Sequence, residues 1–304
     1  KWYDNNFFDD GYHFRYVSRT TGKVIDVNNP QSNDDPRRAI PKASKQIRGV
    51  ANLLMQPNYA PQIYPDKVIK ENFQGEEQYK QAVMLAQNYA KRIGNWVQNE
   101  WQKQDINMKL TQMLILAAKN SISYIQVWPD AVEEKICTQV YDAFDIYIVP
   151  TVTSIYDSPI LVKTMPVFIA ELKANENYDT AQLEKISPDN KYASSEIKEA
   201  YMITRYGSKF ASEKNASLML KEAYIKEYLD DDNIAEIKKQ KDADLILANR
   251  EKGDIVIRQV HSAGGVWLRD VYTNLSEYPF VDFRYEPGTL YQTSLIERFI
   301  PTNK

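Results

Sequence analysis

The sequence has little of the chemistry on which many enzymes depend. Its 304 residues include one cysteine, Cys137, and two histidines, His13 and His261. A single cysteine excludes a disulfide within the chain and a zinc site built from several cysteines. Cys137 lies in the apolar run KICTQV, and free cysteine is among the residue types most often buried. We therefore expect Cys137 to be a small buried side chain.

The common catalytic signatures are also missing. No Walker A, Gly-x-Gly-x-x-Gly, His-Glu-x-x-His or Gly-x-Ser-x-Gly pattern occurs. A catalytic triad or a Cys/His pair would need one of the two histidines, and both lie at or beside predicted turns. His261 begins the glycine-rich stretch HSAGG, where a solvent-facing turn residue is favoured over a catalytic base. No catalytic residue is predicted.

The acidic run Asp230–Asp232 is the best candidate for a metal site. Its carboxylates have the spacing of the first ligands in a calcium loop. However, Ile234 and Ala235 stand where such a loop needs an oxygen ligand and a glycine, so we interpret the run as a solvated turn and helix cap. Carboxylate pairs for glycoside cleavage are recognised by distance in space, which the sequence does not give. We predict no metal, no cofactor and no enzymatic activity.

The chain also lacks an excess of positive charge and a long apolar run. It carries 38 basic and 41 acidic residues, a net charge of −3, so no overall positive field attracts nucleic acid. A tight non-specific DNA-binding protein would be more basic, whereas a conduit through which DNA slides needs walls that bind phosphate weakly. The longest aliphatic patch, MLILAA at 113–118, is far shorter than the roughly 20 residues of a membrane helix. We expect neither a membrane span nor a signal peptide.

What the sequence does contain is typical of a globular chain. Hydrophobic residues make up 43% and charged residues 26%, and the length favours two domains. Apolar residues recur every three or four positions in several segments, which predicts helices. The predicted helices are 36–55, with Ile40, Ala43, Ile47, Val50 and Leu54 on its apolar face; 76–104, with a stripe from Tyr79 to Trp101; 107–122, which should be buried; and 194–207.

Alternating apolar residues and turn signals predict strands as well. Residues 218–229 fit neither period cleanly, so both a strand and a helix remain open there. The predicted strands are the hairpin flanking 20–23, the pair 123–128 and 135–142, the pair 255–260 and 266–272 joined by 261–265, and 278–286. The fold class is therefore predicted to be α+β.

The segment VYDAFDIYIVPTVTSIYDSPILVKTMPVFIAELKAN, residues 140–175, is the most informative part of the chain. A strand with Asp-x-Tyr leads to Pro150, a Thr/Ser linker, an Asp-Ser-Pro turn, a second apolar strand and a short helix that begins near TMPVF. The hairpin around VWLRDVY and then YPFVDFRYEPGTLYQTSLIERFIP at 278–301 follow. Over residues 37–304, this order resembles that of the portal proteins of tailed bacteriophages.

The resemblance implies a portal-like α+β fold with a helical and β wing, a helical stem and a small α/β clip. The wing would comprise residues 1–175, the first stem helix and its approach 176–215, the clip 216–286 and the start of the second stem helix 287–304. The rest of that helix, the tunnel loop and the crown have no counterpart in the sequence. We therefore expect the chain to be a fragment, or to lack its natural flanks.

The resemblance also implies a function. Portal proteins are structural virion proteins that assemble in the bacterial cytoplasm into a dodecameric ring at one capsid vertex, and double-stranded DNA passes through the ring. The implied partners are identical subunits, capsid proteins, terminase and neck or adaptor proteins. Two alternatives remain open: a structural virion adaptor that is not the portal, and a carbohydrate-active hydrolase whose surface Trp and Tyr stack on sugar.

The hairpin at 255–272 supplies the candidate residues for partner binding. Its tip carries Gly264 and Gly265, and alternation is expected to expose side chains along both strands. Trp, Tyr and Arg tend to dominate binding energy at interfaces. The candidate residues are Arg258, Trp267, Arg269 and Tyr272. The alternative is that Trp267 covers the small core of the clip itself.

Overall fold

The computed structural model describes residues 15–17, 24–26, 42–55, 59, 61–65, 72, 75–130, 135–186, 217–248, 250–286 and 294–298. These residues form an α+β fold with antiparallel strand pairing, which confirms the predicted class. The helices are α2 (Lys42–Leu54), α3 (Glu76–Lys103), α4 (Ile106–Asn120), α5 (Ile169–Ala174), α6 (Thr180–Leu183), α9 (Asp231–Ile237) and α10 (Ala243–Leu247), with 3-10 turns η2 (Ile155–Asp157) and η4 (Ile296–Arg298). The strands are β1 (Arg15–Val17), β2 (Val24–Asp26), β3 (Ile122–Asp130), β4 (Lys135–Asp142), β5 (Ile146–Ile148), β6 (Ile160–Phe168), β7 (Ser217–Tyr228), β8 (Ile255–Ala263), β9 (Val266–Thr273) and β10 (Phe280–Arg284).

The described strands form two main sheets and one small hairpin. β1 pairs with β2, as predicted. One main sheet has the order β10-β3-β4 and the other β5-β6-β7-β8-β9. β10 leaves the preceding β8–β9 hairpin and pairs with β3, so that Phe280 lies opposite Gln126. The five-stranded sheet combines β5 and β6 of the expected wing with β7, β8 and β9 of the expected clip, so these two parts share one sheet.

Pairing between strands determines the secondary structure of two segments, which the local sequence alone did not predict correctly. The TMPVF segment was expected to begin a helix, but residues 166–168 belong to β6 because they pair with β7, and α5 begins only at Ile169. The ambiguous segment 218–229 is strand β7, which is hydrogen-bonded on both sides to β6 and β8. The helix predicted at 194–207 and the helix start predicted at 287–289 lie outside the described residues.

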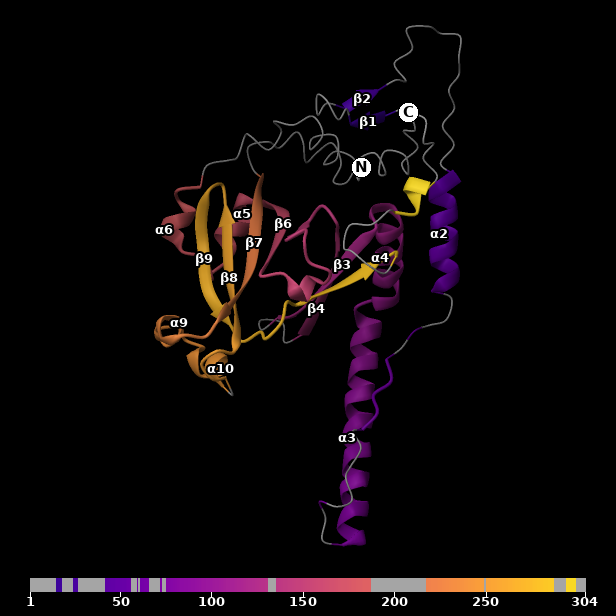
Figure 1. The fold of residues 1–304 in the computed structure, drawn as a ribbon, viewed down its shortest axis with the longest axis vertical. Helices are drawn as coiled ribbons and strands as arrows, with labels where there is room; N and C mark the ends of the chain where they lie inside the picture. Colours follow the sequence, from indigo (N-terminus) through magenta and orange to yellow (C-terminus); the bar gives the residue numbers. More distant parts are fainter. Residues whose placement is uncertain are drawn as a thin grey trace.

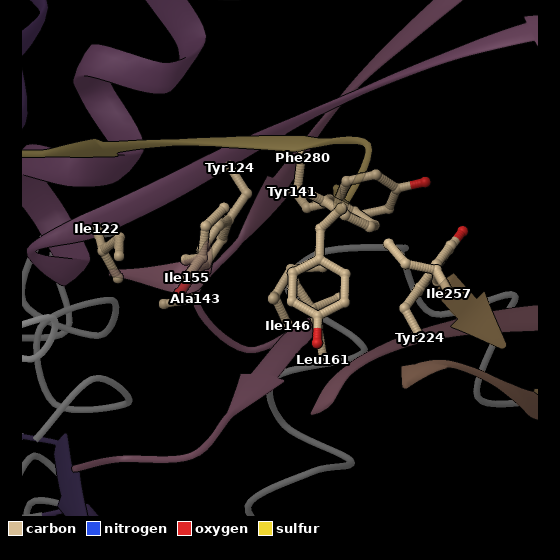
Figure 2. Packing of buried hydrophobic residues seen from close by; sticks show 11 residues of the cluster. Ile122, Tyr124, Tyr141, Ala143, Ile146, Ile155, Leu161, Tyr224, Ile257 and Phe280 are labelled. Carbon is tan, nitrogen blue, oxygen red and sulfur yellow. The ribbon is translucent and has the colours of Figure 1, made fainter. Parts of the chain in front are cut away.

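The main apolar core lies between the two sheets (Figure 2). Tyr124 and Phe280 of the three-stranded sheet share one cluster with Tyr224 and Ile257 of the five-stranded sheet, and each is at most 2% exposed. The Tyr224 and Phe280 rings meet nearly edge to face, with 5.4 Å between centroids, a geometry that aromatic pairs prefer. Burying one large apolar side chain contributes roughly 1.5–3 kcal/mol. This contact therefore holds the two sheets together.

Short helices cover other parts of the five-stranded sheet (Figure 1). α5 and α6 complete a second apolar cluster, and α9 and α10 complete a third. The second cluster consists of Val167, Leu172, Tyr178, Leu183, Leu218, Leu220, Ala263 and Leu268. The third consists of Leu229, Ile237, Ile246, Val256 and Tyr272.

The two long predicted helices exist, but they are buried to very different extents. α4 packs against β3 and buries Met113 and Ala117, as its apolar sequence predicted. α3 extends away from both sheets (Figure 1). Within the described structure, Ala90 is the one α3 residue that is buried. The stripe from Tyr79 to Trp101 therefore has the predicted helical period, and most of α3 stays at least partly exposed.

α2 buries only part of the apolar face that the sequence predicted. Ile47 and Ala51 are buried, at 2% and 3% exposed, whereas Val50 and Leu54 are 53% and 49% exposed. Ile47 packs with Ala118 of α4 in a small cluster. Among the described residues, α4 and Ile296 of η4 pack against one side of α2, and the flanking apolar residues lie on the surface.

Candidate partner-binding hairpin and a buried polar network

The β8–β9 hairpin is tighter than the sequence indicated. β8 continues through Ala263 and β9 begins at Val266, so the turn consists of Gly264 and Gly265 alone. Their φ angles are 58° and 80°. A two-residue turn with both angles positive favours glycine, which adopts them without steric cost. As a consequence, His261 lies within a strand and not at the hairpin tip.

Arg258 is held by neighbouring side chains. Its Nε and Nη2 donate to the two carboxylate oxygens of Asp270 at 2.7 and 2.6 Å, and its Nη1 lies 3.4 Å from Oε1 of Glu227. The guanidinium lies over the Tyr272 ring, 5.8 Å from its centroid. The hydrogen bond to Asp270 is the main reason that the pKa of Arg258 is raised. Arg258 thus fixes β9 against β8, while 32% of its side chain stays exposed.

Tyr272 does not lie on the surface. Only 6% of it is exposed, because Ile237 and Ile246, from α9 and α10, pack in the same cluster. Its hydroxyl donates to Oε2 of Glu227 at 2.9 Å, and burial raises the pKa of the phenol. The expectation that strand alternation exposes Tyr272 is therefore wrong, since two helices cover that end of the sheet.

Trp267 and Arg269 point to opposite faces of the sheet. A register shift places Trp267 opposite Ser262 and Arg269 opposite His261. Because His261 and Ser262 are successive residues of β8, they point to opposite faces of the sheet, and so do their partners on β9. Trp267 is 63% exposed, so it does not cover a local core. Arg269 is half-buried on the side of His261. The four candidates do not form one surface; Trp267 and the outer part of Arg258 remain accessible.

Polar side chains buried between the sheets form a network that the sequence analysis missed. The Lys163 ammonium lies 2.6 Å from Oε2 of Glu222 and donates to Oε1 of Gln126 at 3.1 Å. The Tyr224 hydroxyl donates to Oε2 of Glu222 at 3.3 Å and accepts from Nε2 of Gln126 and Nε2 of Gln259, at 3.1 and 3.2 Å. Lys163 and Glu222 are 5% and 8% exposed. Such burial of charge is tolerated only with good pairing.

Each side chain of this network is bonded to at least one other member of it. Burial raises the pKa of Tyr224, so its hydroxyl remains a neutral donor and acceptor at physiological pH. A satisfied buried network fixes one packing arrangement, and here it joins β3 of one sheet to β6, β7 and β8 of the other. The signal in the sequence was Lys163, a lone charge inside the apolar run ILVKTMPVF.

His261 is buried, which corrects the expectation of a solvent-facing turn residue. It is 6% exposed, and its Nδ1 lies 2.9 Å from the Tyr178 hydroxyl. Its Nε2 has no hydrogen-bond partner in the described part of the chain. Burial lowers the pKa of His261 to about 4 and raises the pKa of Tyr178 to about 12. Both groups are therefore neutral at pH 7.

Other candidate sites are structural. Among the described residues, no group of His, Cys, Asp and Glu side chains is arranged to hold a metal ion. Asp230 caps α9, as predicted, by accepting hydrogen bonds from the amides of Asp232 and Asn233. Cys137 is partly exposed and not fully buried, because it lies on the edge strand β4. The helices that the structure describes include none with both the length and the apolarity to cross a bilayer.

Comparisons with known proteins leave the family open. No family model matches the sequence, and no curated protein is significantly similar to it.

Proposed function

We propose that this chain is a portal-type subunit, a structural virion protein that forms a ring with identical subunits at one capsid vertex of a tailed phage. The ring would be a dodecamer that passes double-stranded DNA during packaging and ejection. It would contact capsid proteins, terminase and neck or adaptor proteins. Energy for DNA movement would come from the terminase, and the chain itself would act without a cofactor.

The observation that best supports the proposal is an exposed apolar stripe on α3, which differs from the predicted stripe between Tyr79 and Trp101. Leu85, Tyr89, Ile93 and Trp96 recur at spacings of three and four residues and are 57%, 61%, 50% and 51% exposed. An apolar stripe of this kind marks an interaction surface, and a long helix gains most of its stability by packing such a face. In a closed ring, every subunit meets the same neighbouring surface. Identical subunits can therefore cover the stripe on every copy.

Replacing apolar side chains of this stripe with carboxylates tests whether the stripe holds subunits together in a ring. In the intact protein, Tyr89→Glu combined with Ile93→Glu should convert rings to monomers, because carboxylates would be buried without partners. The matched control is Met84→Glu: Met84 is 65% exposed but lies about 100° around the helix from Leu85. Native mass spectrometry and negative-stain images report the assembly. Rings that persist in the double variant contradict the role of the stripe, and a monomeric wild-type protein contradicts the ring.

A passive conduit should bind DNA weakly. Because the net charge is −3, we expect poor binding to duplex DNA at physiological salt, where charges are screened beyond about 8 Å. Fluorescence anisotropy with a labelled duplex over a range of salt concentrations measures this. A tight, steeply salt-dependent affinity would contradict passive passage.

The exposed tryptophan of the hairpin is the best candidate for a contact with the adaptor or terminase. Trp267→Ala should leave the ring intact and weaken attachment of one of these partners by at least about tenfold. The matched control is Tyr228→Ala on β7, since Tyr228 is 71% exposed but lies away from the hairpin tip. Co-sedimentation of rings with each partner provides the measurement. Unchanged attachment, or loss of the ring, would show that the hairpin has a different role.

A further inference from the structure

The segment formed by α5 and α6, residues 169–186, is attached to the five-stranded sheet by the second apolar cluster. Leu172 and Leu183 of the segment belong to that cluster. Beside them, the Tyr178 hydroxyl lies 2.9 Å from Nδ1 of His261, and the two rings meet edge to face with 5.6 Å between centroids. This contact joins the segment to β8, near the end of the strand, by a buried polar bond.

The charges around His261 come from the three neighbouring strands. Glu222 of β7 and Arg269 of β9 are its partners in register, and Lys163 of β6 also acts on it. The Glu222 carboxylate is already paired with the Lys163 ammonium at 2.6 Å. The charged residues of the segment itself are exposed to solvent; they are Glu171, Lys173, Glu176, Asp179, Glu184 and Lys185. A protonated His261 would face two cations and one carboxylate that is already engaged.

We propose that His261 and Tyr178 form an acid-sensitive latch, which holds residues 169–186 on the sheet at neutral pH and releases them when His261 takes up a proton from solvent. In the neutral ring that carries its hydrogen on Nε2, Nδ1 accepts the hydrogen of the Tyr178 hydroxyl. Protonation places a hydrogen on Nδ1, so the Tyr178 hydroxyl could stay bonded only by turning from donor to acceptor, and it adds a positive charge near Arg269 and Lys163. It also keeps the Nε2 hydrogen, which has no partner among the described residues. Release exposes both ring nitrogens to water.

The pH window follows from the pKa of His261 in the two states. In the closed state the pKa is lowered to about 4, whereas a released imidazole has a pKa of about 6.5. The latch is fully effective above the higher value and weakens as the pH falls toward the lower one. Each pH unit within the window raises the opening equilibrium constant by up to about tenfold, on the order of 100-fold in all. Because α6 contacts β9, release removes support from the strand that carries Trp267.

Hydrogen exchange on the intact protein tests the latch, whether or not the protein forms a ring. After correction for the intrinsic pH dependence of exchange, protection of residues 169–186 should fall by on the order of 100-fold between about pH 7 and about pH 4. Protection of α4 should not change. In His261→Gln, the side-chain amide can still bond to Tyr178 but does not titrate, so the selective loss of protection should disappear. A wild-type protein without selective loss, or the same loss in the variant, overturns the latch.

A second measurement needs no substitution at position 261. The sequence contains only two histidines, His13 and His261, so NMR of labelled histidine resolves their titrations. One signal should titrate well below the ordinary value of about 6.5, with a midpoint that coincides with the loss of protection. If both histidines titrate near the ordinary value while residues 169–186 stay protected, the latch is also overturned.

Discussion

α3 and the five-stranded sheet use apolar side chains in opposite ways. In the described structure, Ala90 is the one buried residue of the 28 in α3, while Tyr89 and Trp96 are more than half exposed. In the sheet, Leu161 and Ile257 have no exposed surface. The sheet buries its apolar residues within the subunit, whereas the stripe on α3 would be buried only by a partner. Stability therefore depends on the sheets, whereas the proposed association would depend on α3.

The largest effect on stability is expected in the core between the sheets. Phe280→Ala should lower the free energy of unfolding by about 4 kcal/mol, because it removes a ring that is 1% exposed and leaves a cavity against Tyr224. Phe283→Ala on the same strand is the control, since Phe283 is 37% exposed, and should cost less than about 1.5 kcal/mol. Urea denaturation followed by circular dichroism measures both. Equal costs would show that the two-sheet core does not dominate stability.

Substitutions in the buried ion pair between Lys163 and Glu222 test whether polar groups between the sheets also stabilise the fold. Lys163→Met should cost about 3 kcal/mol, because it leaves the Glu222 carboxylate buried without its cation. The double variant Lys163→Met/Glu222→Leu should recover most of the loss, since an apolar pair can replace a buried ion pair. Urea denaturation of the wild-type protein and of these two variants measures the three free energies of unfolding. A double variant as unstable as the single one would show that the pair cannot be replaced.

Periodicity predicted most of the elements but not their partners. The helices α3 and α4 and the strands β3 and β4 lie where alternation and three- or four-residue spacing placed them. Local sequence does not determine which strands pair, so β10 was not predicted to join β3. Pairing with β7 also extended β6 through Phe168, where a helix was expected. These features depend on contacts between residues far apart in the chain.

The candidate site was predicted only in part for the same reason. The hairpin and its glycine turn could be recognised from alternation, and Trp267 is exposed as expected. Burial of Tyr272 required α9 and α10, which sequence reasoning did not place over β9. The glycine-rich stretch HSAGG indicates a turn at His261, but the turn is shorter than this stretch, because β8 continues through Ala263. Alternation along a strand does not show which side chains are buried by elements from other parts of the chain.

Two glycines, one in the β8–β9 turn of the sheet and one in helix α2, should respond in opposite ways to an added Cβ. Gly265→Ala in the hairpin turn should destabilise by about 1–2 kcal/mol, because its φ of 80° disfavours any residue with a Cβ, although no atom lies within 4 Å of the added carbon. Gly49→Ala in α2 also meets no atom within 4 Å and should stabilise by up to about 1 kcal/mol. Thermal unfolding of the two variants should therefore shift in opposite directions. Shifts in the same direction would contradict the turn geometry.

The smallest effect on stability is expected on the exposed stripe of α3. Trp96→Ala should change the free energy of unfolding of the dissociated subunit by about 0.5 kcal/mol or less, because the side chain is 51% exposed and surface substitutions seldom cost more. The same substitution should weaken association between subunits by more than about tenfold, since a tryptophan at the centre of an interface commonly contributes over 1.4 kcal/mol. Urea denaturation of the subunit and analytical ultracentrifugation of the assembly provide the two numbers. If Trp96→Ala lowers the free energy of unfolding of the isolated subunit by about 2 kcal/mol and leaves association unchanged, Trp96 stabilises the subunit and does not bind a neighbour. The contrast between α3 and the sheet would then be wrong.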